Sequence, residues 1–169
     1  VHFMGFDRIT IIHPSMHLIG GAERLVTDLA IALANEETII EVVTGLCHDF
    51  WWRELSREEG VLVKELGQMA HGNLGFWLNV KGFAKALTKL INPKTEMIIT
   101  SSFPSSLAAE SFRKWYDVKV IHYLHDAPMV LHDRQGLKAI PLRLRVFYQL
   151  VSALYAKEDI EAVRRSDLI

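Results

Sequence analysis

The sequence predicts an α/β fold: a doubly wound, Rossmann-like and mainly parallel sheet with helices on both faces. Two observations predict it. Short apolar runs alternate along the chain with segments of helical periodicity, as in repeated strand–helix units. Hydrophobic residues make up 50% of the 169 residues and charged residues 23%, which is a globular balance. Right-handed crossovers then place helices on both faces, and ligands bind beyond the carboxyl ends of the strands.

The first half of the chain is expected to contain three strands and two helices. An apolar run predicts a strand at residues 8–14, and an apolar stripe with helical spacing predicts a helix at residues 22–33. β-Branched residues predict a second strand at residues 39–44. Asp49 is expected to cap a short helix, after which an alternating pattern predicts a third strand at residues 61–66.

The helical period returns after a polar, glycine-containing loop. It predicts one helix over residues 76–91, followed by a short buried strand at residues 97–100. Ser101 then precedes a helix that has Pro104 near its first turn and an apolar face extending to Trp115.

The remainder of the chain predicts one more strand and one long helix. Apolar residues predict the strand at residues 118–124, and residues 129–140 read as loop and short helix. Pro141 opens a final helix that either runs or restarts through Arg165, and residues 167–169 look like the start of another strand. The apolar side of the final helix is expected to contain Leu144, Phe147, Leu150, Val151 and Leu154.

Composition and charge exclude several classes of protein. The formal net charge is −1, which gives no reason to expect a nucleic-acid partner. No apolar segment is long enough for a transmembrane helix and no signal peptide is expected, so we expect a cytoplasmic protein.

Residues 1–3 precede Met4 and are excluded from the fold argument, so one domain is expected over residues 4–169. Cys47 is the single cysteine, and a small filler side chain is its simplest interpretation.

The most distinctive segment is the loop that follows the first strand and ends in Gly20, Gly21, Ala22 and Glu23. Glycine lets backbone N–H groups approach a phosphate closely, and the helix start adds unpaired N–H groups and the positive end of its dipole. The segment lacks both Gly-x-Gly-x-x-Gly and the P-loop Gly-Lys-Ser/Thr. It therefore indicates an anion site of another kind, with an ordinary turn as the alternative. Glu23 either complements the helix dipole or orders the loop through a hydrogen bond.

A second distinctive segment lies at the end of the fifth expected strand. Strand alternation places His122 and Leu124 on one face and Tyr123 and His125 on the other. His125 is then expected at the crevice, where its ring can donate to a sugar hydroxyl or stabilise developing charge; an ordinary loop histidine is the alternative. Asp126 is a candidate to orient this ring. No metal site is expected, because zinc sites add cysteine or carboxylate ligands at helix or turn spacing.

Two further features have both a structural and a functional interpretation. Ser101 and Ser102 follow a strand and precede a helix, so an N-cap explains them, although this loop also faces the crevice. The basic and apolar segment at residues 134–155 is either an ordinary surface helix or a peripheral contact with the cytoplasmic face of an anionic membrane.

Taken together, these residues resemble the N-terminal domain of a GT-B-fold glycosyltransferase of family 4, the group 1 glycosyltransferases. The resemblance is carried by His13-Pro14, by the Gly-Gly-Ala-Glu-Arg-Leu-Val run at residues 20–26, and by Tyr-Leu-His-Asp at residues 123–126. It covers nearly the whole chain in order and spacing. The His-Pro pair combined with the glycine run is especially similar to mannosyltransferases that extend lipid-linked oligosaccharides.

The resemblance implies one half of a GT-B architecture, in which a second doubly wound domain faces this one across a cleft. That C-terminal donor-binding domain, expected as a partner, is absent from this chain, so the chain alone is expected to be inactive. The implied reaction is a retaining transfer of a sugar from a nucleotide-diphosphate sugar to a glycan or lipid-linked acceptor, without a cofactor or an obligatory metal. Gly20 and Gly21 are expected at the donor diphosphate, and His125 at the donor sugar near the reacting carbon.

The expected substrate-binding residues are His13, Glu23, Ser101, Tyr123 and Asp126. A different class of function stays open beside this one. The same architecture suits a non-catalytic α/β module that binds an anionic small molecule.

Overall fold

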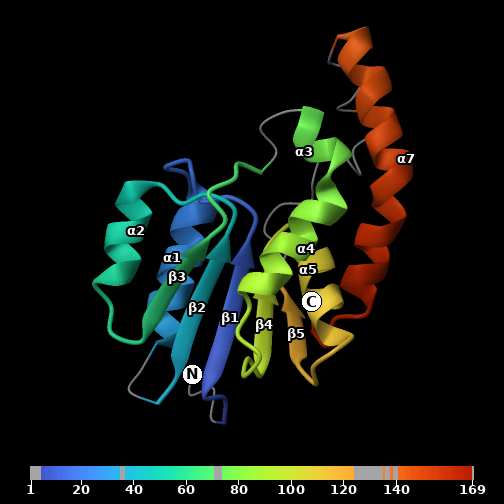
Figure 1. Ribbon diagram of the computed structural model, residues 1–169. Helices are drawn as coiled ribbons and strands as arrows, with labels where there is room; N and C mark the ends of the chain where they lie inside the picture. The colour runs from blue at the N-terminus through green and yellow to red at the C-terminus, as the bar shows by residue number, and fades with distance from the viewer. Residues whose placement is uncertain are drawn as a thin grey trace.

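The computed structural model describes residues 5–34, 37–70, 74–123, 135, 138 and 141–168. Its centre is a five-stranded sheet in which every neighbouring pair of strands is parallel (Figure 1). The strands are β1 (Arg8–His13), β2 (Ile39–Thr44), β3 (Val61–Glu65), β4 (Met97–Thr100) and β5 (Lys119–His122). The described helices are α1 (Gly21–Leu33), α2 (Asp49–Ser56), α3 (Leu74–Leu78), α4 (Val80–Leu90), α5 (Ser105–Arg113) and α7 (Leu142–Arg164). The α/β fold class and the five expected strands are confirmed.

β1 lies in the middle of the sheet, in the strand order β3-β2-β1-β4-β5. From β1 the chain proceeds outward through β2 to β3, and then returns to add β4 and β5 on the other side. The boundary between β1 and β4 is therefore the topological switch point, which is where open α/β sheets bind ligands. Ile12 and Thr100 are paired in register across this boundary, so His13 and Ser101 follow them on neighbouring strands.

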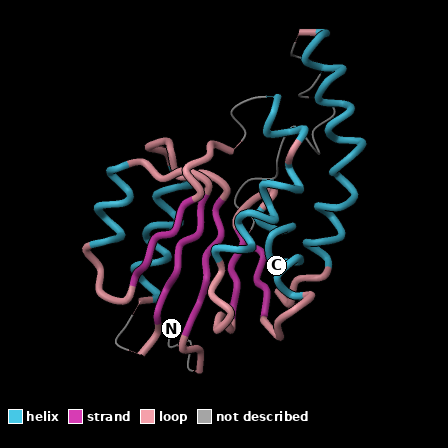
Figure 2. The backbone as a smooth tube through the Cα atoms, viewed as in Figure 1, coloured by secondary structure: helices cyan, strands magenta, loops and turns pink. Residues whose placement is uncertain are grey.

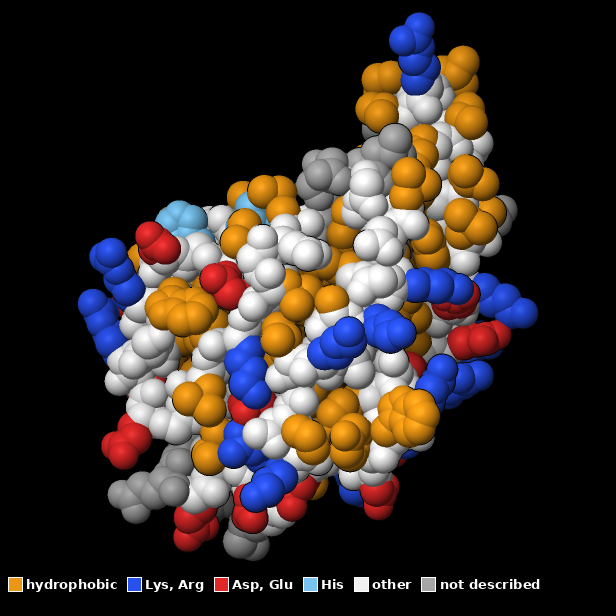
Figure 3. Space-filling model, viewed as in Figure 1, with side chains coloured by type: hydrophobic (Ala, Val, Ile, Leu, Met, Phe, Trp, Pro, Cys, Tyr) orange, Lys and Arg blue, Asp and Glu red, His pale blue; other side chains and the backbone are white. Residues whose placement is uncertain are grey.

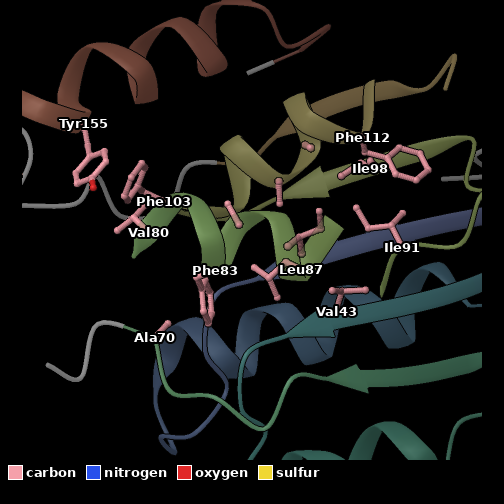
Figure 4. Packing of buried hydrophobic residues seen from close by; sticks show 14 of the residues in the cluster. Val43, Ala70, Val80, Phe83, Leu87, Ile91, Ile98, Phe103, Phe112 and Tyr155 are labelled. Atoms are coloured by element: carbon pink, nitrogen blue, oxygen red, sulfur yellow. The ribbon is translucent and has the colours of Figure 1, made fainter. Parts of the chain in front are cut away.

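Alternate side chains of the strands form two separate cores, one on each face of the sheet. Ile9 and Ile11 of β1 pack with residues of α1 and α2, whereas Ile12 packs with residues of α4, α5 and α7. Figures 1 and 2 show these helices as layers on the two faces, and Figure 4 shows the second core from close by. Burial of each such aliphatic side chain stabilises the fold by roughly 1.5–3 kcal/mol.

The helix expected over residues 76–91 is two helices, so that prediction was wrong in detail. α3 ends at Leu78 and α4 begins at Val80, because the backbone of Asn79 leaves the helical region (φ −119°, ψ 25°). The Asn79 side chain folds back over Gly82, where an added Cβ would lie 2.2 Å from the amide oxygen of Asn79. Asparagine favours such local arrangements over a helix interior. Because Gly82 has no side chain, it leaves room for the side chain of Asn79.

Two expectations about helix ends are also corrected. His48 caps α2 in place of Asp49: its ring Nδ1 accepts a hydrogen bond from the N–H of Phe50 at 3.1 Å, and Asp49 is the first helical residue. Trp115 lies beyond the end of α5 and is 81% exposed, so the buried face of this helix ends at Phe112. At the start of α2, the ring nitrogen of His48 takes the place of the side-chain oxygen that usually caps a helix. The known capping preferences do not indicate histidine at such a position.

α7 is a single helix of 23 residues whose N-terminal half extends beyond the carboxyl edge of the sheet (Figures 1 and 3). Leu144, Leu150 and Leu154 are between 48% and 56% exposed, so the expected apolar side was wrong for these residues. The residues that α7 buries instead are Val151, Tyr155, Asp159 and Ala162. Among the described residues, no helix combines the length and the apolar character needed to cross a bilayer.

The last described residues pair with β5. Leu168 forms a parallel bridge with Ile121, and the N–H of Asp167 donates to the carbonyl of Val120 at 2.7 Å, so the expected strand-like pairing is confirmed there. The Asp167 carboxylate accepts a second hydrogen bond from the Val120 N–H, also at 2.7 Å. This backbone hydrogen bond, helped by nearby Arg113, holds the pKa of Asp167 below its usual value.

An ion cluster joins three neighbouring strands inside the sheet. Glu41 of β2 is 1% exposed, and its Oε1 lies 2.5 Å from Arg8 Nη1 of β1 and 3.0 Å from Lys64 Nζ of β3. Removing a carboxylate from water is costly unless opposite charges and hydrogen bonds replace the water. The two cations supply that replacement at Oε1, whereas Oε2 is buried without a hydrogen-bond partner among the described residues.

Candidate functional site

Three strands end side by side at the carboxyl edge of the sheet, and the candidate site is built from the residues at these ends. β1 ends at His13, and Ser101 directly follows β4. The His13 ring Nδ1 and the Ser101 hydroxyl are hydrogen-bonded at 2.6 Å, and both side chains are buried. The bond spans the switch point between β1 and β4. Two of the expected site residues, 88 positions apart in the chain, are therefore in direct contact.

A second pair of the same kind lies one strand further along. The Thr100 hydroxyl of β4 is hydrogen-bonded to the ring Nδ1 of His122, the last residue of β5. The next residue, Tyr123, donates its backbone N–H to the carbonyl of Thr100 at 2.7 Å, and its side chain is 44% exposed. The burial of His122 and the exposure of Tyr123 confirm the alternation expected for these two residues. The three strand ends are thus joined by two histidine–hydroxyl pairs.

Sequence analysis missed a buried carboxylate beside these pairs. Asp159 of α7 is 5% exposed, and its Oδ1 accepts a hydrogen bond from the hydroxyl of Ser106 at 3.0 Å. Burial lowers the pKa of His122, and the negative charge of Asp159 opposes that shift. A signal existed, because Asp159 stands at helical spacing between Tyr155 and Ala162, both buried.

The glycine loop enters α1 at the same edge of the sheet. Gly20 is the N-cap of α1, in extended conformation (φ −134°). A Cβ added at Gly20 would lie 2.7 Å from Oε2 of Glu23, whose side chain folds back toward the cap. Apart from the adjacent residues and the backbone of α1 itself, nothing lies within 4 Å of a Cβ added at Gly21. The two glycines therefore differ: Gly20 makes room for Glu23, and Gly21 leaves its backbone open.

The path of this loop is determined by contacts with the neighbouring β2–α2 connection. The Nε1–H of Trp51 donates to the carbonyl of Leu18 at 2.7 Å, and the N–H of Met16 donates to the carbonyl of Leu46 at 2.8 Å. Gly45 makes this approach possible, because an added Cβ there would lie 2.5 to 2.7 Å from atoms of three other residues. Since a real Cβ cannot be accommodated at such distances, Gly45 is a structural requirement that sequence analysis did not single out.

A hollow of about 590 Å³ lies against the start of α1, on the side that faces α2. Its lining includes Gly20, Gly21 and Arg24 from α1 and its cap, and Phe50 and Trp51 from α2. This volume is within the range of small-molecule sites. Asp28 and Glu54 also line it, and Arg24 lies 3.7 Å from the Asp28 carboxylate, so the hollow combines open backbone and apolar walls with charges of both signs.

The N-cap explanation of the serines is wrong for Ser101. Pro104 is the N-cap of α5, and the Ser101 hydroxyl bonds to His13 instead. Burial, with help from Glu65 and Asp49, raises the pKa of the Cys47 thiol to about 11, which fits the interpretation of Cys47 as an unreactive filler.

His125 and Asp126 lie outside the described residues, so their expected roles stay predictions. Across the described part of the chain, no three histidine, cysteine, aspartate or glutamate side chains come together as candidate metal ligands. Comparison with protein-family models, with curated proteins and with solved structures found no match for this chain. Function must therefore be argued from the site.

Proposed function

We propose that this chain is the acceptor-side domain of a retaining glycosyltransferase. The reaction would move a sugar from a nucleotide-diphosphate sugar to a glycan or lipid-linked acceptor. The observation that carries the proposal is the contact of His13 with Ser101 at the switch point, beside the exposed Tyr123. These three are among the residues expected to bind substrate. The common edge on which they lie is where folds of this class bind nucleotides and sugars.

The glycine loop would serve the donor in this scheme. Its backbone at Gly21 is open, and the N-terminus of α1 favours negative charge, so a diphosphate is a suitable ligand there. His125 follows the last residue of β5 by three positions, so it belongs to a connection that starts at the same edge. Its proposed role is to donate to the donor sugar and stabilise charge that develops at the reacting carbon.

A second doubly wound domain is part of this proposal, because a single domain cannot enclose the donor and acceptor together. Closing a cleft positions the reactants and excludes water, and both effects are large in group transfer. The nucleotide would be held by that domain, and the transfer needs no metal or cofactor in this scheme.

Transfer by the full-length protein tests the proposal. Uridine- and guanosine-diphosphate hexoses with a radiolabelled sugar would be incubated with extracted lipid-linked glycans, and the transfer of label would be measured.

His125→Ala is expected to lower kcat/KM by about 10²–10³-fold, the usual effect of removing a group that stabilises developing charge. His71→Ala is the matched control, because His71 belongs to no motif. Normal turnover by H125A would contradict the role of His125. Tight binding of free phosphate with no transfer from any donor would favour the non-catalytic module.

A peripheral contact with the cytoplasmic face of a membrane is a second proposal, supported by the N-terminal half of α7. Residues 142–153 contain Arg143 and Arg145 but no acidic residue, and Leu142 and Val146 are 69% and 59% exposed. Figure 3 shows hydrophobic side chains over this projecting part of α7. Such a surface suits anionic lipid headgroups. Co-sedimentation with vesicles containing phosphatidylserine tests it, and Arg143→Glu combined with Arg145→Glu is expected to abolish the binding.

A further inference from the structure

The solvent-facing side of α7 carries apolar residues at the spacing of a coiled coil. Val146, Ala153 and Ile160 follow one another at intervals of seven residues, and all three are exposed. Leu142 precedes Val146 by four positions, so it occupies the second apolar position of the same heptad repeat. Tyr155 and the other buried residues of α7 lie on the opposite side of the helix. The seam formed by Leu142, Val146, Ala153 and Ile160 is therefore left for a second helix to cover.

The charges of α7 are segregated along its length. Residues 142–153 contain two arginines and no acidic residue, whereas the three acidic residues of the helix all lie at residues 158–161. An anionic membrane therefore does not explain the whole seam, because the acidic end would be repelled by it. A helix with the same charge distribution that runs in the opposite direction would place a basic half against an acidic half all along the seam.

Arg143 and Glu161 are the charged residues that this arrangement would pair. They are 18 residues apart, which is five full helical turns, so both flank the seam on the same side. In an antiparallel pair of identical helices, Arg143 of each copy faces Glu161 of the partner copy, whereas a parallel pair would bring like charges together. Glu161 makes long ion pairs within α7, 3.8 Å to Lys157 and 3.9 Å to Arg165, and its side chain is 44% exposed, which leaves the carboxylate open to a further cation.

Ala153 is the centre about which the seam is self-complementary. Val146 and Ile160 are each seven residues from Ala153, so Val146 of one copy meets Ile160 of the other. The exposed Leu150 and Leu154 meet in the same way on one flank of the seam. A small residue at the centre lets the two helices approach closely.

The position of α7 leaves room for such a partner. Its N-terminal half extends beyond the carboxyl edge of the sheet, and its C-terminal half packs on the rest of the chain through the side opposite the seam (Figure 1). In an antiparallel pair, the sheets of the two copies would then lie on opposite sides of the paired helices.

We propose that two copies of this chain associate through the seam of α7, as an antiparallel helix pair with a two-fold axis at Ala153. A single helix pair is smaller than a standard interface, so the dissociation constant is expected to be about 1–100 μM. This inference goes beyond the proposed glycosyl transfer and does not depend on it. It also means that a second copy and a membrane would compete for the N-terminal half of α7.

Sedimentation equilibrium of the chain without lipid, over about 1–300 μM, tests the association. The mass is expected to rise with concentration from 19.3 kDa toward twice that value. Val146→Glu places a charge in the seam and is expected to raise the dissociation constant at least tenfold. Trp115→Glu is the matched control, because Trp115 is 81% exposed and lies outside α7, and it is expected to change the constant less than about twofold.

Reversal of charge tests the antiparallel orientation. Arg143→Glu and Glu161→Arg are each expected to raise the dissociation constant by about threefold or more, and the two together are expected to restore it, because the pairs form again with their signs exchanged. Circular dichroism checks that every variant keeps its helices. A monomeric mass at all concentrations would overturn the inference, as would unchanged dimerisation of V146E or a double variant no better than the single ones. Binding to phosphatidylserine vesicles by a chain that stays monomeric would assign the face to the membrane instead.

Discussion

The hydrogen bond between His13 and Ser101 is open to a quantitative test, because both partners are buried and belong to adjacent strands. Ser101→Ala removes the hydroxyl that bonds to the ring Nδ1 at 2.6 Å and, more weakly, to the carbonyl of Ile12 at 3.3 Å. A hydrogen bond contributes about 0.5–1.5 kcal/mol net, and a buried partner that loses it costs about 1–3 kcal/mol. Since Ser101 is 2% exposed, water cannot easily replace it, and we expect a loss of about 2 kcal/mol.

Urea denaturation of four proteins measures this effect: the unmodified chain, S101A, His13→Leu and the double variant. The double-mutant cycle is expected to give a coupling energy of about 1–2 kcal/mol, and S101A is expected to lower Tm by about 4–8 °C. Ser56→Ala, at an exposed position at the end of α2, is the control and is expected to change stability by less than about 0.5 kcal/mol. Additive single effects would refute the reasoning, because two residues that are not in contact should not couple.

Three further predictions follow from buried groups near the sheet. Gly45→Ala is expected to lower the free energy of unfolding by more than about 3 kcal/mol, because the new Cβ meets backbone atoms within 2.7 Å; a Tm within 3 °C of the unmodified chain would contradict this. Glu41→Gln is expected to cost about 2–3 kcal/mol in urea denaturation, since it leaves Arg8 and Lys64 without their counter-charge, with partial exposure of both cations limiting the loss; no measurable loss would contradict it. The third concerns pH: burial lowers the pKa of His122, so the unfolded chain binds a proton more readily. Stability should therefore fall as the pH drops below about 6.5, the usual histidine pKa, and His122→Asn should flatten that dependence of Tm on pH; an unchanged slope would contradict it.

The strands were predictable because their signal is local. β1, β2 and β4 are short apolar runs bounded by turn residues, and buried parallel strands have this pattern. The alternation at His122 and Tyr123 was predictable for the same reason, since neighbouring residues of a strand face opposite sides. The shared edge of His13, Ser101 and Tyr123 followed from the parallel arrangement itself.

What sequence analysis missed depends on contacts between distant residues. Nothing local indicates that the Ser101 hydroxyl bonds to a histidine 88 positions away in place of capping α5. The break at Asn79 depends on a side chain that folds over Gly82, and the requirement for glycine at Gly45 depends on the backbones of two neighbouring connections. The buried position of Asp159 depends on how α7 packs against α5. Tertiary packing determines each of these four features, and the local propensities of the sequence do not indicate how the chain packs.

Hydrogen–deuterium exchange of the full-length protein, with and without a nucleoside-diphosphate hexose, tests the central claim most directly. The claim is that the connections after β1 and β4 form one ligand crevice at the carboxyl edge of the sheet. It predicts that the donor slows exchange in residues 14–21 and 101–104 together. Protection confined to the far groove between α4, α5 and α7, which Lys85 and Lys114 help to line, would contradict it.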